Sequence, residues 1–194
     1  MKIIELYKVI FCSESKKYKI IFRTLENDKE FILFFESHYA KNIAMASENI
    51  ASISLSQYEL FINLLNDLKM KVDKVLLKEK NNILSCVINI SNHNKSVNEI
   101  YSFVGDAIII ALKTFSNIYI DENFLVDLND NNLIKKKYFK DDTAEEELKK
   151  NILHENNSIK SKVDILESAL AESISSENYE AAAFIRDRIK QLRQ

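Results

Sequence analysis

The chain has 194 residues, of which 46% are hydrophobic, with one glycine, no proline and a formal net charge of −2. This length and composition predict one domain with a substantial core and a small appendage. The near balance of acidic and basic side chains argues against a basic arm that binds nucleic acid.

Neither a membrane span nor a targeting segment is expected. No apolar run approaches the roughly 20 residues that a spanning helix needs, and the opening MKIIELYK carries charges where a signal peptide is apolar. We therefore expect a cytoplasmic protein with no membrane partner. Cys12 and Cys86 stand alone in the sequence, which predicts reduced core thiols and not a disulfide or a zinc site.

The first 125 residues alternate between strand-like and helix-like segments. Runs rich in β-branched and aromatic residues predict strands, and apolar residues three or four apart predict helices. Strands are expected over residues 3–11, 17–25, 30–35, 71–79, 83–91, 98–103 and 117–122, and helices over residues 39–50, 58–70 and 105–115. Strands with helices grouped between them predict an α+β fold, with a mixed β-sheet packed against helices.

Three details of this pattern make specific predictions. In the second helix Leu60, Leu64 and Leu68 recur every four residues, which predicts that they form its buried face. In the third helix Ile109 and Ala111 are expected to be inaccessible. Asn81 and Asn82 separate two strand-like runs and predict the turn of a hairpin.

The C-terminal part predicts a linker followed by two helices. Residues 126–145 are charged and rich in asparagine, as in a linker, and residues 146–194 are expected to form an antiparallel helical hairpin. Two short helices can cover only part of each other, so the hairpin should dimerise, dock on the body or bind a partner's helix. Its apolar stripes are Ile159, Val163, Leu166 and Leu170 in one helix, and Ala182, Ile185, Ile189 and Leu192 in the other.

A lysine-rich segment lies within the expected linker. KKKYFK, residues 135–140, interleaves lysines with Tyr138 and Phe139, as in segments that stack single-stranded bases beside phosphate-binding charge. The acidic run DDTAEEE follows directly. Both nucleic-acid contact and a solvated linker are compatible with this pattern.

The only glycine, Gly105, stands directly before Asp106 and an apolar run. Glycine tolerates unusual backbone dihedrals, and the helix dipole favours an aspartate in a first helical turn, so a purely structural role explains the pair. A functional site explains it equally well.

The stretches IAMASEN, ELFINLLNDLKMKVDKVLL and GDAIIIALKTFSNIYIDENFL make residues 1–125 similar to the bifunctional nuclease family, which is named for DNase and RNase activity. Its strongest motif is Ser-Asp-Ala, an apolar helix, and a strand reading Ile-Tyr-Val. Asp106 matches the aspartate of this motif, and Gly105 falls where the family has serine. The resemblance implies an enzyme that hydrolyses phosphodiester bonds in DNA or RNA.

Other motif positions depart from the family. A glutamate that opens a Glu-Ala-Gln-Ala stretch is replaced here by Tyr39, and a His-Asp pair by Tyr58 and Glu59. A strand acid is replaced by Tyr101, and basic and proline residues by Phe103 and Val104. The arginine and histidine of the family pattern are therefore missing.

Three carboxylates remain as candidate catalytic residues, Asp106, Glu59 and Glu48. Carboxylates can hold Mg²⁺ or Mn²⁺, which activates water and stabilises charge at phosphorus, and Asp106 is the expected metal ligand. Such a site requires that the three side chains converge. The alternative is that Asp106 is only a first-turn helix anion, and that Glu48 and Glu59 lie on solvated helix faces.

The segment LESALAESISSENYEAAAFIRDRIKQLR resembles the UVR motif, the helical hairpin found in excinuclease subunits B and C. The resemblance implies a protein partner, and a homodimer is possible. The expected partner-binding residues are Tyr179, Ala182, Ile185, Arg186 and Ile189.

Two hypotheses about function remain open. The chain is either a metal-dependent nuclease carrying an interaction hairpin, or a catalytically eroded nuclease-like domain that serves as a protein-binding or regulatory scaffold. The resemblance over the whole body favours the first hypothesis. The missing arginine and histidine favour the second.

Overall fold

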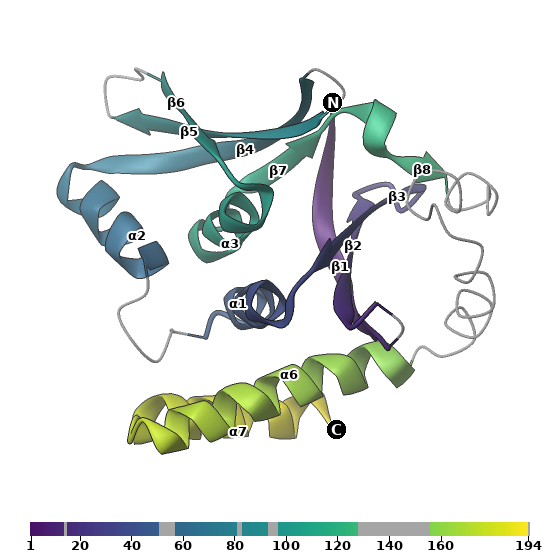
Figure 1. Ribbon diagram of the computed structural model, residues 1–194. Helices are drawn as coiled ribbons and strands as arrows, with labels where there is room; N and C mark the ends of the chain where they lie inside the picture. Colours follow the sequence, from purple (N-terminus) through teal and green to yellow (C-terminus); the bar gives the residue numbers. More distant parts are fainter. Residues whose placement is uncertain (14, 51–56, 81–82, 93–96, 128–155, 194) are drawn as a thin grey trace.

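The body is an eight-stranded sheet with its helices on one side (Figure 1). The computed structural model describes residues 1–13, 15–50, 57–80, 83–92, 97–127 and 156–193. The strands are β1 (Lys2–Cys12), β2 (Lys17–Thr24), β3 (Lys29–Phe35), β4 (Met70–Lys80), β5 (Ile83–Asn92), β6 (Val97–Ser102), β7 (Asn117–Ile120) and β8 (Val126–Asp127). The helices are α1 (Ser37–Ser47), α2 (Gln57–Asp67), α3 (Val104–Thr114), α6 (Asn156–Ser175) and α7 (Tyr179–Leu192), with a 3₁₀ turn η1 at Glu122–Phe124.

The strand order is β6-β5-β4-β7-β1-β2-β3-β8, and every neighbouring pair is antiparallel except β4 and β7. The predicted α+β fold with a mixed sheet and a C-terminal helical hairpin is therefore confirmed. β7 joins the two halves of the sheet, because it pairs with β4 on one edge and with the start of β1 on the other. Cys12 and Cys86 are buried thiols, as expected of core residues.

The sheet extends to Asp127 at the end of β8. Val126 is buried and lies opposite Glu30 in β3, so the sheet continues through β8. The remaining linker residues, including the KKKYFK segment, lie outside the described residues, as does the turn at Asn81 and Asn82. None of the helices that the structure describes is long and apolar enough to cross a membrane.

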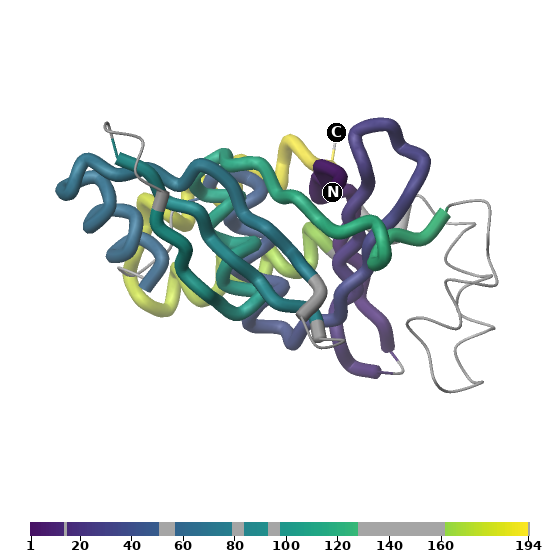
Figure 2. The backbone as a smooth tube through the Cα atoms, turned by 90° about the horizontal axis from the view of Figure 1, so that it is seen from above, coloured from purple at the N-terminus to yellow at the C-terminus, as the bar shows by residue number. Residues whose placement is uncertain are grey.

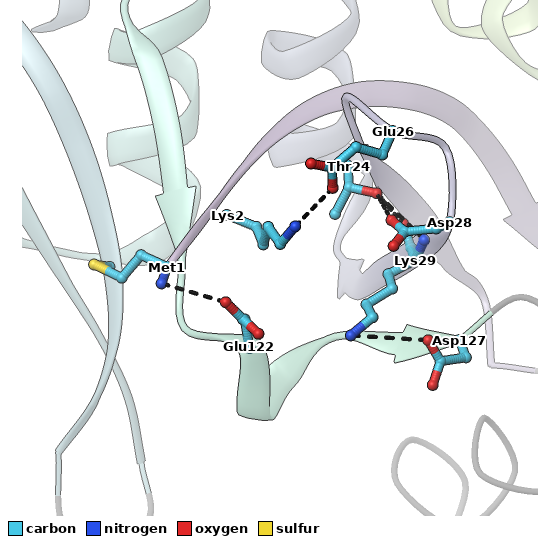
Figure 3. Close-up of polar contacts among 8 residues, drawn as sticks. All are labelled: Met1, Lys2, Thr24, Glu26, Asp28, Lys29, Glu122 and Asp127. Atoms are coloured by element: carbon cyan, nitrogen blue, oxygen red, sulfur yellow. Dashed lines mark hydrogen bonds and ion pairs between the residues drawn. The ribbon is translucent and has the colours of Figure 1, made fainter.

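Polar contacts join the β2–β3 turn to the first strand and β8 to β3 (Figure 3). Lys2 Nζ lies 2.8 Å from Glu26 Oε2, and the Thr24 hydroxyl donates to Asp28 Oδ1 at 2.5 Å. Lys29 and Asp127 form an ion pair across β3 and β8. Solvent screens the Lys2–Glu26 and Lys29–Asp127 ion pairs, so they contribute little to stability. The main effect of the contacts at Thr24 and Glu26 is to fix the path of the turn.

α3 is the central helix of the body. Six of its residues are buried, including Ile109 and Ala111 as predicted, because the sheet covers one side and α1 and α2 cover others. A helix that is apolar around most of its circumference can be stable only in the interior. Its charged residues, Asp106 and Lys113, lie toward its two ends.

The predicted buried face of α2 is wrong. Leu60, Leu64 and Leu68 are 66%, 53% and 59% exposed, and the buried residues of the helix are Tyr58 and Leu65. Apolar residues occur on both faces of this helix, so spacing by four residues identified the wrong one. The contact with α3 selects the face that carries Tyr58 and Leu65.

Four helices end without a glycine. The residues in the left-handed conformation at these ends are Asn49, Lys69, Phe115 and Glu177, with φ between 54° and 57°. Glycine usually occupies this position because it lacks a Cβ. The single glycine of the chain lies inside α3, so its placement there needs a separate explanation.

Candidate functional site

Asp106 lies in the first turn of α3 and accepts a hydrogen bond from a tyrosine. The Tyr58 hydroxyl, at the start of α2, donates to Asp106 Oδ1 at 2.7 Å. Burial raises the pKa of Tyr58, and the hydrogen bond to Asp106 raises it further. Burial, the charge of Asp106 and a hydrogen bond to it likewise raise the pKa of Tyr39 in α1. Both phenols therefore stay protonated beside one carboxylate, and the Tyr58 hydroxyl donates a hydrogen bond to it.

Gly105 provides the space for this tyrosine cluster. Its backbone φ is not positive, so the conformational freedom of glycine is not what the position requires. A Cβ at residue 105 would lie 2.7 Å from Tyr39 Cδ1 and 3.0 Å from Phe35 Cε1. Both rings pack against each other, with centroids 5.5 Å apart, so they leave little room for even one methyl group. The glycine is a requirement of close packing.

Glu59 lies next to Tyr58 but points to the other end of α3. Its Oε1 accepts from Lys113 Nζ at 2.5 Å, and both side chains are largely shielded from solvent. Residues 106 and 113 are seven apart, so they are separated by about 10 Å along the helix axis. Tyr58 and Glu59 thus fasten the start of α2 to both ends of α3.

Glu48, just after α1, is an anchor for the C-terminal hairpin. Its side chain is 4% exposed and is paired with Lys162 of α6 and with Arg188 of α7. Burial alone would raise the pKa of Glu48, but the hydrogen bonds and charges of Lys162 and Arg188 outweigh that effect and lower it. Neither Glu48 nor Glu59 is the solvated helix residue that the alternative reading of the sequence expects.

The three candidate carboxylates have separate sets of partners. Asp106 faces two tyrosines, Glu59 faces Lys113, and Glu48 faces the hairpin. Within the described residues, no three histidine, cysteine, aspartate or glutamate side chains are grouped so that they could hold a metal ion. The carboxylates in this arrangement do not fit a Mg²⁺ or Mn²⁺ site, since such ions need several oxygen ligands directed at one point.

A cleft of about 520 Å³ lies away from Asp106. It is lined by β1, by the last turn of α3 together with the turn to β7, and by Lys162 and Leu192 of the hairpin. Asp106, Glu59 and Glu48 are not among its lining residues. The hairpin therefore completes a concave surface at the end of α3 opposite to the tyrosine cluster.

The hairpin is docked on the body. Docking was one of three predicted alternatives, together with dimerisation and binding of a partner's helix. Val163, Leu166 and Ile185 are buried against Met45 and Ile50, and Ile165 of α6 belongs to the main core. Lys41 of α1 also pairs with Glu172 of α6. The view from above in Figure 2 shows the hairpin extending beneath the body. The stripe residues whose side chains are described are thus covered by α1 as well as by each other.

Docking divides the predicted partner-binding residues into two groups. Ala182, Ile185 and Ile189 are buried within the chain, so in this state they offer nothing to a partner. Tyr179 is 68% exposed, and Arg186 is exposed and paired with Asp187. Two further exposed apolar residues, Ile174 and Phe184, were not identified from the sequence, because they fall outside the periodic stripes.

The tyrosines were also missed as site residues. Tyr39 and Tyr58 were noted only as departures from the family pattern, and nothing in their spacing indicates that they share a carboxylate. The only available signal was that both fall at motif positions, together with Gly105 and Asp106.

Comparison with known proteins establishes the family. The bifunctional nuclease domain matches residues 20–130, which is more than half of the chain, and the UvrB/UvrC motif matches residues 160–194. The chain therefore belongs to the bifunctional nuclease domain family and carries a C-terminal UVR hairpin. Among curated proteins, none matches the chain.

The close packing at Gly105 predicts that a serine there destabilises the protein. Gly105→Ser should lower the free energy of unfolding by roughly 1–3 kcal/mol, because the Cβ collides with the Tyr39 ring. Denaturation in urea measures this change. In a Tyr39→Ala background the same serine should cost much less, since it has better helix propensity than glycine once the ring is gone. An equal loss in both backgrounds would contradict the packing argument.

The lowered pKa of Glu48 predicts that hairpin docking weakens in acid. At pH values above 4.5, the ordinary pKa of a glutamate, the Glu48 carboxylate is ionised and its ion pairs stabilise docking. This contribution is lost as the pH falls through the lower pKa that Glu48 has in the folded state. Amide hydrogen exchange in α6 and α7, corrected for the intrinsic effect of pH, should show the loss. Glu48→Gln should remove this pH dependence and cost roughly 1–3 kcal/mol at neutral pH. Glu167→Gln is the matched control, because its exposed pair with Arg193 contributes about 1 kcal/mol or less.

Proposed function

We propose that this chain is a protein-binding scaffold built on a bifunctional nuclease domain, with the UVR hairpin as its partner-binding element. The observation that carries the proposal is the arrangement at Asp106. The carboxylate at the family's strongest motif accepts a hydrogen bond from Tyr58 of α2 and lies near Tyr39 of α1, and a glycine stands beside it to admit the Tyr39 ring. This arrangement suits a structural hydrogen-bond centre that joins three helices.

The contacts of the other two carboxylates, Glu59 and Glu48, support the same proposal. Glu59 fastens α2 to Lys113, and Glu48 fastens α1 to both helices of the hairpin. Each charge is neutralised by protein cations, so neither is available to activate water or to hold a metal. Family membership suggests nucleic acid as a possible ligand, but the polar residues of this site are used to hold helices together.

The exposed side of the hairpin is the surface that we assign to the protein partner. Ile174, Tyr179 and Phe184 are each more than half exposed, whereas the buried stripe holds the hairpin to α1. Aromatic residues contribute much of the binding energy at protein interfaces, because they bury a large area with few rotatable bonds. Arg186 and Asp187 add charged groups beside them.

Substitutions on the two sides of the hairpin should separate binding from folding. Phe184→Lys should abolish capture of the partner by the immobilised full chain, because it places a charge in the assigned interface, and should leave thermal unfolding unchanged. Leu25→Lys is the control, because Leu25 of the body is 55% exposed and Phe184 is 56% exposed. The Leu25→Lys variant should capture the same partner as the unmodified chain. Partners retained by Phe184→Lys but lost with Leu25→Lys would contradict the assignment.

Nuclease activity is the second candidate function. Membership of the bifunctional nuclease domain family favours it, and Asp106 occupies the aspartate position of the motif. The chain offers no matched arginine or histidine for such a reaction.

A cleavage assay distinguishes the two functions. Purified full-length protein should not cleave single- or double-stranded DNA or RNA in Mg²⁺ or Mn²⁺ above the level of an Asp106→Asn preparation. That variant should remain folded, which circular dichroism checks, because asparagine can still accept from Tyr58. Cleavage that requires the metal and disappears in Asp106→Asn would establish the nuclease and overturn the scaffold.

A further inference from the structure

β6 forms one edge of the sheet. It pairs with β5 along one side, and no strand in the described part of the chain lies along its other side. Figure 1 shows β6 at the margin of the sheet, followed directly by α3. In an edge strand the N–H and C=O groups of alternate residues point outward, and they form a template for another strand.

Within the described residues, this edge has few of the features that usually prevent strand addition. Such features are prolines, charged side chains, bulges, short length, or a covering helix or loop. β6 has six residues in continuous register with β5, contains neither proline nor lysine, and carries one charged side chain, Glu99. The opposite edge of the sheet, β8, is only two residues long. Of the two edges, only β6 is long enough to support a stable ladder.

The side chains at the β6 edge are exposed and include large apolar groups. Ile100 is 40% exposed, Tyr101 is 64% exposed, and Phe103, which follows the strand, is 79% exposed. Ile100 lies opposite the core residue Ile88, so it is on the helix-covered face of the sheet, and Tyr101 is on the other face. Apolar surface is therefore present on both faces of this edge, as a strand-mediated interface requires.

We infer that β6 pairs with β6 of a second copy of this chain, so that the two sheets become one continuous antiparallel sheet across a two-fold axis. The two-fold axis exchanges the two β6 strands, so it must pass between a residue of one strand and the same residue of the other strand. These two equivalent side chains lie directly opposite each other in the ladder and point to the same face of the sheet. An axis at Glu99 would oppose two carboxylates, which is unfavourable. An axis at Ile100 instead pairs Glu99 with Tyr101 and Asn98 with Ser102, and uses all residues from 98 to 102.

The proposal therefore specifies a register as well as an interface. Two Ile100 side chains meet on the helix-covered face, next to the end of each core. Two Tyr101–Glu99 pairs form on the other face, so that no two carboxylates oppose each other. This interface is separate from the hairpin, so it does not depend on the function proposed above.

Disulfide trapping tests the register directly. Opposed residues at the axis have Cα atoms about 4.5–5.5 Å apart, within the range of a disulfide. Ile100→Cys should form a covalent dimer on mild oxidation, whereas Glu99→Cys should not, because its opposite residue is Tyr101. Cys12 and Cys86 are buried and should not compete. Equal cross-linking of both variants, or of Glu99→Cys alone, would overturn the register.

The mass in solution tests the interface. Sedimentation equilibrium of the full chain should show dimers of the 22.6 kDa chain, and Ile100→Lys should convert them to monomers by opposing two charges at the axis. Leu64→Lys is the control, because Leu64 is similarly exposed but lies on α2. A monomeric wild type, or dimers that Leu64→Lys dissociates and Ile100→Lys does not, would overturn the proposal.

Discussion

The burial of α3 is the constraint on which the rest of the structure depends. This helix is apolar around most of its surface, so it must be enclosed, and the concave side of the sheet covers only part of it. α1 and α2 cover the remainder and are held in place by contacts with its polar residues. Tyr58 binds Asp106 near the start of the helix, and Glu59 binds Lys113 near its end. The residues that look catalytic in the sequence are the ones that join these helices.

The need to cover apolar helix surface also explains the position of the hairpin. α1 faces α3 on one side and would expose Met45 on the other, and α6 and α7 cover that side. Ile165 reaches the main core, so the hairpin is part of the packing of the body. Glu48 provides the polar part of the junction, because one nearly buried carboxylate neutralises a cation from each hairpin helix. Removing either cation would leave a buried charge less well compensated, which is costly in a site of low polarity.

Membership of a family and retention of its chemistry are separate questions in this chain. The nuclease domain is recognisable over more than half of the sequence, and its fold is preserved by the apolar pattern of the strands and of α3. The motif positions carry different chemistry. Tyrosines donate hydrogen bonds and fill volume, whereas the glutamate and histidine of the family pattern can bind metals or transfer protons. A fold can therefore persist while the site that it supports changes function.

The sequence by itself determined the elements and their class, because β-branched runs and helical spacing are local properties. It identified strands β1–β7, the buried helix that begins near Gly105, and the two C-terminal helices, but it assigned the residues of β8 to the linker. It could not choose the face of α2, since Leu60, Leu64 and Leu68 are as apolar as the face carrying Tyr58 and Leu65, and only contact with α3 distinguishes them. It also left the role of Gly105 open, because the Tyr39 ring that requires a glycine comes from a helix more than sixty residues away. The partners of Asp106, Glu59 and Glu48 were decided by the tertiary structure for the same reason: each lies on a different element, and the direction of a side chain depends on how whole elements pack.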